Sequence, residues 1–429
     1  MYPTKPTPRD PLGWCVALAL AFWALLLVRL TIPTEPYFDE VHYLPAAREY
    51  WKLGRFLNRE HPLLGKELIA LGMQLFGDRP LGWRIFPSLA GVLTLFAAMR
   101  AIWFAAQSRF ATLAYGVLLA TGFYLFVNAR IAMLDIFMVG FIALAYWQLA
   151  AAIREPERGR LRLIAAGLAL GLGLASKWNA APLVVLPGLA FLIFRARAGR
   201  RRFLTTRRGA PVPGVSLLEA GLWLGALPLV VYALTYLPAW FFADGGIGTP
   251  SGSANLVALH ADAIRLQESV VKPHPYMSRW PQWVLNARSI WFLYEPVDGA
   301  RRGIVLIGNP LTMLLGLPAL LWAASEAILR RSWAAAAATV LYAVTLGFWI
   351  ASAKPVQFLY HYFLPSMALL AALALALDAL WAQGRRWMAL VPLAGSVAIF
   401  VYFYPILSAA PLSGGKMAFT QWMWLPGWR

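Results

Sequence analysis

A cluster of acid–base residues follows directly after the first apolar stretch of the chain. Residues 37–61 read YFDEVHYLPAAREYWKLGRFLNREH and place Asp39, Glu40, His42 and His61 close together. Carboxylates and imidazoles are the side chains that most often move protons in enzymes. Partial burial at a membrane boundary disfavours a charged carboxylate, which could tune one of the two acids into a working base. The alternative is structural, with Asp39 as the N-cap of a helix that begins beside it.

Isolated cations near the apolar segments could neutralise an anionic group such as a phosphate. Lys66 follows His61-Pro62 in the first turn of an expected helix, where the helix N-terminus also attracts anions. A lysine that snorkels to the headgroup level explains Lys66 equally well. Arg84 begins an apolar stretch, where a guanidinium needs a partner, and its planar fork fits phosphate. Lys177, in ASKWNAA, is a further lone cation.

Further candidates come from three polar motifs. Arg130 and Asp135 lie five residues apart in NARIAMLD, so a direct salt bridge on one helix face is not automatic, and either could be a structural tether. The motifs HPYMSRWPQW and YHYFLP contribute His274, Tyr276, Arg279 and His361.

The sequence gives no support for a particular metal or other cofactor, and a metal requirement stays open. The chain contains no HExxH, CxxC, Walker or Rossmann pattern, which removes support for metalloprotease, redox and nucleotide-binding activities. His61, Glu67 and His274 could in principle meet at a divalent ion, but no ligand spacing supports such a site.

The composition indicates a polytopic membrane protein. Of 429 residues, 60% are hydrophobic and only 13% are charged, whereas soluble domains are about one quarter charged. Because a spanning helix needs about 20 mostly apolar residues, the sequence predicts eleven spans. They are 12–30, 81–106, 110–127, 133–153, 161–176, 178–194, 216–238, 304–323, 333–352, 360–381 and 388–407.

The arginines give these spans an orientation. The net charge of +19 comes largely from arginines clustered in short connectors, which is the positive-inside pattern and argues against nucleic acid as a partner. The N-terminus is then cytoplasmic, and 31–80 and 239–303 are long outer loops. Thirteen of the nineteen acidic residues and all five histidines lie on the outer side, which predicts chemistry there. Amphipathic and aromatic patterns predict interfacial helices in both loops.

Taken in order, these motifs resemble the protein O-mannosyltransferase family. The resemblance extends from about residue 37 to 365 and rests mainly on FDEVH and HPLLGK, with WRIFPSLAG, NARIAMLD, GLALGLGLASKWN, HPYMSRWPQW, GNP and YHYFLP in support. It implies a single all-α membrane domain over residues 1–429 with the GT-C glycosyltransferase fold. It also implies a sugar donor linked to a polyprenyl phosphate, and a place in the bacterial inner membrane with the active site on the periplasmic side.

The resemblance also implies roles for individual residues. Asp39 is expected to be the catalytic base of an inverting transfer, with Glu40 supporting the same site. Lys66 and Arg84 are expected to contact the lipid phosphate or the loop that holds it. The other donor-site residues are Arg130, Lys177, His274 and Arg279, and the less firmly assigned ones are His42, His61, Asp135, Tyr276 and His361.

The acceptor is the main open point at this stage. The expected reaction is mannosyl transfer to Ser or Thr hydroxyls of exported proteins, with membrane lipids and the secretion machinery as further candidate partners. The outer loop 239–303 is too short for the MIR region of eukaryotic members, and HPP is replaced by His61-Pro62-Leu63. The alternative is a related GT-C enzyme that transfers a sugar from a polyprenyl phosphate to lipid A or another glycan. A carrier or channel would instead need charges buried along a path through the spans.

Overall fold

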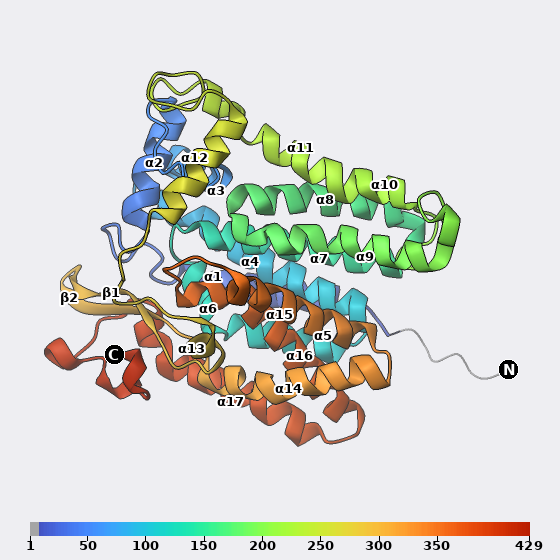
Figure 1. Cartoon of the computed structure of the whole chain (residues 1–429). Helices are drawn as coiled ribbons and strands as arrows, with labels where there is room; N and C mark the ends of the chain where they lie inside the picture. Colours follow the sequence, from blue (N-terminus) through green and yellow to red (C-terminus); the bar gives the residue numbers. More distant parts are fainter. Residues whose placement is uncertain (1–7) are drawn as a thin grey trace.

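Long apolar helices form the main body of the computed structural model, which describes residues 8–429 (Figure 1). Within this range, nine helical segments are long and apolar enough to cross a membrane. Seven contain α4 (Pro80–Ala106), α7 (Leu134–Arg154), α8 (Gly159–Ser176), α9 (Ala181–Gly199), α14 (Pro310–Leu329), α15 (Trp333–Ala351) and α17 (Arg386–Leu407). The other two are α16 (Phe363–Ala382), which extends an outer 3₁₀ turn, and α10 (Leu217–Gly221) joined to α11 (Leu227–Leu234) through a π-helical turn.

Two of the eleven predicted spans are shorter than expected. Helix α1 covers Leu12–Leu27, and the stretch predicted as 110–127 is divided into α5 (Arg109–Ala120) and α6 (Phe123–Asn128). The break follows Thr121, whose hydroxyl bonds both to the carbonyl of Val117 and to Ser396 on α17. Such tertiary partners can satisfy a polar break at membrane depth, so the apolar pattern alone did not reveal it.

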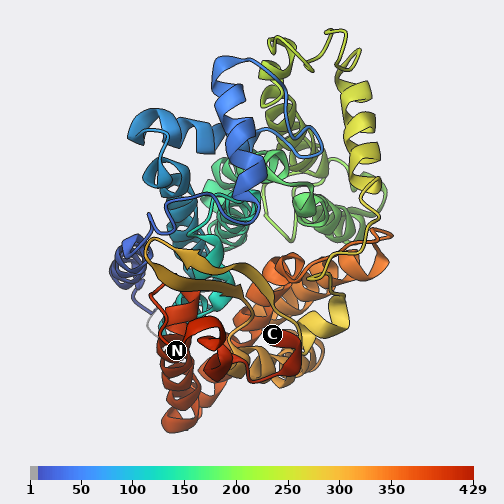
Figure 2. The same ribbon diagram turned by 90° about the vertical axis from the view of Figure 1, so that its left-hand side faces the viewer.

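The two long outer loops lie at the same end of the helical bundle. In Figure 1, α2 (Glu40–Lys52), α12 (Leu256–Glu268) and the C-terminal segment gather at the left, and Figure 2 faces this end. Helix α3 (Leu64–Phe76) connects α2 to α4 and packs against both. The helices α2 and α3 confirm the amphipathic helices expected in the first outer loop.

The second outer loop departs from an all-α fold. Beyond the short helix α13 (Trp280–Val284), strands β1 (Ile290–Val297) and β2 (Ala300–Leu306) form an antiparallel hairpin. Its two-residue turn is Asp298-Gly299, both with positive φ, which is the turn chemistry that tight hairpins favour. The predicted span 304–323 was therefore placed too early, because Pro310 begins the helix after β2 ends.

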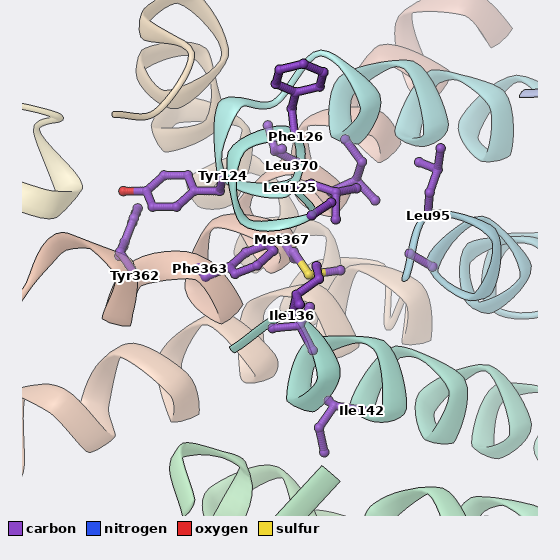
Figure 3. Packing of buried hydrophobic residues seen from close by; sticks show 14 of the residues in the cluster. Leu95, Tyr124, Leu125, Phe126, Ile136, Ile142, Tyr362, Phe363, Met367 and Leu370 are labelled. Carbon is purple, nitrogen blue, oxygen red and sulfur yellow. The ribbon is translucent and has the colours of Figure 1, made fainter. Parts of the chain in front are cut away.

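Close packing of aromatic and aliphatic side chains holds the bundle together. Figure 3 shows Tyr124 of α6 next to Tyr362 and Phe363 at the start of α16, and all three are buried. Gly140 of α7 faces the backbone of α4, where a Cβ atom would lie 3.1 Å from the carbonyl oxygen of Ala90. Small residues at such crossings let helices approach closely, which fixes the outer ends of α4 and α7 beneath the first outer loop.

Candidate active site

A cavity of about 280 Å³ opens where the two outer loops meet the outer ends of the helices. Four parts of the chain line it: the first outer loop, the turn between α8 and α9, the end of α12 and the segment before α16. The lining residues are Asp39, His42, Tyr43, Asn58, Glu60, His61, Lys177, Trp178, Asn179, Gln267, Val270, Lys354, Tyr360 and His361. Five predicted site residues, from positions 39 to 361, therefore share one cavity.

Asp39 lies directly before α2, but its side chain does not cap that helix. Only its backbone carbonyl is used, accepting from the amides of His42 and Tyr43, and the half-buried carboxylate lines the cavity. Burial raises the pKa of Asp39 to about 6, while nearby Lys177 opposes the rise. The structure thus leaves Asp39 with a carboxylate that is free to act as a base near neutral pH.

Lys177 brings a buried positive charge to the same cavity. It lies where α8 ends and a 3₁₀ turn (Trp178–Ala180) begins, and its Nζ donates to Oδ2 of Asp135 at 2.6 Å. The ammonium also lies 5.0 Å from the ring centre of Tyr360. Asp135, in the first turn of α7, is therefore the partner that holds Lys177 in place and not a cavity residue itself.

Lys354 is a cavity cation that the sequence analysis missed. It lies between α15 and α16, is half-buried, and its Nζ makes no hydrogen bond or ion pair with any residue between 8 and 429. Burial lowers the pKa of Lys354, with a further contribution from Lys177. The available signal was a lone lysine in an outer connector six residues before the YHYFLP motif. Two lysines that line one cavity suit a phosphate group.

Glu40 and Arg84 form a buried ion pair beneath the cavity. Nε and Nη2 of Arg84 donate to the two carboxylate oxygens of Glu40, each at 2.8 Å, and neither side chain is exposed to solvent. Arg84 also donates to the carbonyl of Pro33 at 2.6 Å, and Glu40 accepts from the amide of Ala132 at 3.0 Å. In this structure these partners occupy the guanidinium and hold the first outer loop, and the contact of Arg84 with the lipid phosphate stays a prediction. Glu40 likewise holds the loop and does not face the cavity.

Arg130 and Lys66, which were also predicted to bind the donor, make hydrogen bonds within the protein, and their part in donor binding stays a prediction. Arg130 donates to the carbonyls of Val28 and Arg29 at 2.7 and 3.0 Å, which ties the chain after α1 to the base of α7. The fully buried Lys66 donates to the carbonyls of Asn58 and His61 at 2.6 and 2.9 Å. Lys66 thereby shapes the loop that carries the cavity residues and does not reach the cavity itself.

The histidines differ in their surroundings. Burial lowers the pKa of His61 well below its usual range, so that it faces the cavity as a neutral imidazole. His361 is buried, with its ring stacked 3.7 Å from that of Trp349.

The predicted residues of the HPYMSRWPQW motif lie outside the cavity lining. His274 packs edge-on against Phe358, with ring centres 5.3 Å apart, and accepts a hydrogen bond from the amide of Tyr276. Arg279 is exposed where α13 begins. Because none of these side chains lines the cavity, their part in donor binding stays a prediction.

Metal binding finds no ready site in the described part of the chain. Between residues 8 and 429, no group of three or more histidine, cysteine or acidic side chains is arranged to hold an ion. Glu67, considered with His61 and His274, does not line the cavity.

Comparisons with known families agree with this fold and cavity. Two family models described as dolichyl-phosphate-mannose-protein mannosyltransferase match residues 16–83 and 60–211. A third, described as the C-terminal four-transmembrane region of protein O-mannosyltransferase, matches residues 253–428. Together the three models account for most of the chain.

Similar proteins and structures cover nearly the whole chain. Proteins named polyprenol-phosphate-mannose–protein mannosyltransferase from Mycobacterium tuberculosis H37Rv and Corynebacterium glutamicum are each 29% identical. The matches cover 98% and 99% of this chain, and 93% and 95% of the relatives. The Saccharomyces cerevisiae Pmt1-Pmt2 complex bound to the sugar donor superimposes with a TM-score of 0.78 at 14% identity, over 99% of this chain and 95% of that one. ArnT from Cupriavidus metallidurans bound to undecaprenyl phosphate gives 0.55 at 18% identity, over 89% and 64%.

The fold and these matches define an integral membrane glycosyltransferase with the GT-C fold. More narrowly, the chain belongs to the protein O-mannosyltransferase family, as FDEVH and HPLLGK indicated.

Proposed function

We propose that this protein transfers a mannosyl residue from a polyprenyl-phosphate-linked donor to Ser or Thr hydroxyls of exported proteins. The observation that carries the proposal is a single cavity that joins a free carboxylate with raised pKa, Asp39, to two lysines, Lys177 and Lys354. The names of the bacterial relatives supply the donor and the class of acceptor.

The reaction is a single displacement at the anomeric carbon of the sugar. Asp39 takes the proton of the acceptor hydroxyl while the oxygen of that hydroxyl attacks the anomeric carbon. The bond between the carbon and the phosphate oxygen breaks, and the lipid phosphate leaves with the electron pair. Lys177 and Lys354 stabilise the charge on the departing phosphate, within a cavity partly shielded from water. Attack from the side opposite the leaving group inverts the anomeric configuration.

The site is proposed to face away from the cytoplasm. The cavity lies at the end of the bundle that carries both long loops, whereas arginine-rich connectors such as 195–208 lie at the other end (Figure 1). With the arginine-rich end inside, the N-terminus is cytoplasmic. Exported proteins would meet the cavity as they leave the membrane, which makes the secretion machinery a candidate partner.

The proposal is tested with the purified full-length protein in nanodiscs and radiolabelled polyprenyl-phosphate-mannose. A Ser/Thr-rich peptide and an extracted lipid acceptor are offered separately. Label on the peptide supports protein O-mannosylation. Label on the lipid alone assigns the same chemistry to a lipid or glycan acceptor, and no transfer to either acceptor contradicts the proposal. Hydrolysis of the product by mannosidases specific for one anomer reports whether the transfer inverts.

Removing the free cavity lysine should weaken the use of the donor. Lys354→Met is expected to lower kcat/KM for the donor by roughly 10- to 100-fold, because a charge-assisted contact to the phosphate is lost. Lys354 is the better residue for this test, because replacing Lys177 would also leave the buried Asp135 without its ion-pair partner. Initial rates at varied donor concentration measure the effect. Lys272→Met, at an exposed lysine of the second outer loop, is the matched control. Equal donor kinetics in both variants would remove Lys354 from the phosphate site.

The rate should depend on pH through Asp39. A base must be ionised to accept a proton, and burial raises the pKa of Asp39 to about 6. The single-turnover rate is therefore expected to rise as the pH increases through about 6, to level off above it, and to be lost as the pH falls. Donor binding measured on the same samples separates ionisation of the base from changes at the lysines. A rate that stays constant across this range would exclude Asp39 as the titrating base.

A further inference from the structure

A second cavity, of about 320 Å³, opens beside the reaction cavity and has no part in the mechanism above. It lies between the two outer loops and is lined by Arg55, Phe56, Leu57, Asn58, Arg59, Glu60, Asp244, Gly245, Ser251 and Leu266. Asn58 and Glu60 line both cavities, so these two residues form a shared wall. A molecule bound in the second cavity would therefore lie next to the site where Asp39 acts.

The frame of this second cavity is held by the protein itself. The backbone of residues 53–56 pairs with that of residues 243–244, through hydrogen bonds that include Phe56 N to the carbonyl of Asp244 at 2.8 Å. Beneath this pairing, the rings of Phe56 and Phe242 stack with their centres 4.9 Å apart. The two outer loops thus form one rigid unit at this point, and the cavity does not need a ligand to create it.

The acidic side chains around the second cavity are already engaged. Glu60 accepts a hydrogen bond from the Asn58 amide at 2.7 Å, and Asp244 accepts one from the hydroxyl of Ser251. The Glu60 carbonyl accepts from Gln267 of α12 at 2.6 Å, which ties the shared wall to the second outer loop. Each of the two carboxylates therefore already has a hydrogen-bond donor within the protein, although both keep their negative charge.

Arg55 and Arg59 each have guanidinium N–H groups that make no hydrogen bond within the described part of the protein. The closest carboxylate to the Arg55 guanidinium is Glu49, at 3.8 Å, and 62% of the Arg55 side chain is exposed. Arg59 uses one nitrogen, Nη1, for long contacts of 3.4 and 3.2 Å to the carbonyls of Gly245 and Ser251. Free guanidinium donors beside satisfied acids make the cavity attractive to an anionic group, and carboxylates fit the guanidinium fork well.

We propose that this second cavity binds the acceptor polypeptide and favours sequences with an acidic side chain near the acceptor hydroxyl. Four charged side chains in the lining suit a polar polypeptide, whereas acyl chains need apolar walls. The inference rests on the proposed function and adds to it a selection of acceptors by charge. Arg55 and Arg59 are the specificity-determining residues, and the polypeptide passes over Asn58 and Glu60 to reach the reaction cavity.

The test compares peptides that differ only in one charge. Three Ser/Thr peptides carry Asp, Asn or Lys at offsets of about two to five residues from the acceptor, the reach of an extended chain across the shared wall. The full-length protein in nanodiscs is expected to use the Asp peptide with about three- to tenfold higher kcat/KM than the Asn peptide, and less so at high salt. Arg55→Gln combined with Arg59→Gln should remove this preference, so that the Asp and Asn peptides are used with equal kcat/KM because the Asp peptide loses its advantage. Arg48→Gln, in the same loop but paired with Asp78, is the control and should keep it.

The outcomes separate this inference from the proposed function. If the Asn and Asp peptides are used equally by the unmodified protein, the charge selection is wrong while protein mannosylation stands. An equal loss for both peptides in the arginine variant would also overturn the inference. So would competition by phosphatidylglycerol vesicles that the arginine variant abolishes, because the cavity would then bind a lipid headgroup. If no peptide is labelled, the proposed function fails and the inference fails with it.

Discussion

Asp39→Asn is expected to lower the rate of mannosyl transfer by about 10²–10⁴-fold while the protein keeps its fold. Asparagine has nearly the same shape as aspartate, but its amide cannot take the proton of the acceptor hydroxyl. The Asp39 side chain makes no cap hydrogen bond that the change would remove, so helix α2 should form as before. Single-turnover transfer to a Ser/Thr peptide measures the rate, and the thermal unfolding midpoint reports the fold.

Two further measurements make this result specific. Donor binding by the Asp39→Asn protein should be nearly unchanged, because the two cavity lysines that we propose to contact the phosphate remain in place. Asp78→Asn removes a carboxylate from the same outer loop, where it pairs with Arg48 outside the cavity, and should retain full activity. Near-normal transfer by Asp39→Asn would show that another group is the base, and Glu60 would be the next carboxylate of the cavity to test.

The membrane-spanning part of the fold was largely readable from the sequence. In lipid, a single chain segment satisfies its own backbone hydrogen bonds only as a helix, so a long apolar stretch already specifies its structure. The hairpin β1–β2 gave no such signal, because its strands are held by each other and by the C-terminal segment, as in the bond from Leu412 to the carbonyl of Arg301. Contacts between distant residues such as these leave little trace in local hydrophobicity.

The same distinction applies to the active site. The motifs around Asp39, Lys177 and His361 were recognisable, and the fold brings all three to one cavity. The local sequence could not show which polar side chains would form hydrogen bonds or ion pairs inside the protein. The partner of Arg84 lies 44 residues away, and that of Lys177 lies 42 residues away. Lys354 was overlooked for the converse reason, since an isolated lysine in a short connector matters only once the fold places it beside Lys177.

Breaking the Glu40–Arg84 pair should lower the stability of the protein, whereas changing the neighbouring Asp39 should lower the transfer rate and leave the fold intact. Both side chains are fully buried and joined by two hydrogen bonds of 2.8 Å. Removal of one partner leaves an uncompensated charge in the interior, which typically costs about 3–5 kcal/mol. Glu40→Gln and Arg84→Met are therefore each expected to lower the thermal unfolding midpoint and the amount of protein in the membrane. Any loss of transfer should follow the loss of folded protein.

Replacing both members of the pair distinguishes a positioning role from a catalytic one. Glu40→Leu combined with Arg84→Met removes both charges, so it should cost less stability than the two single changes added together. Arg48→Met provides the exposed comparison, because its ion pair with Asp78 is solvated and worth at most about 1 kcal/mol. If Glu40→Gln instead folds normally but fails in transfer, Glu40 acts in the chemistry, as its place in the FDEVH motif first suggested. Loss of stability with activity preserved per folded molecule would leave Asp39 as the acidic residue of that pair that reacts.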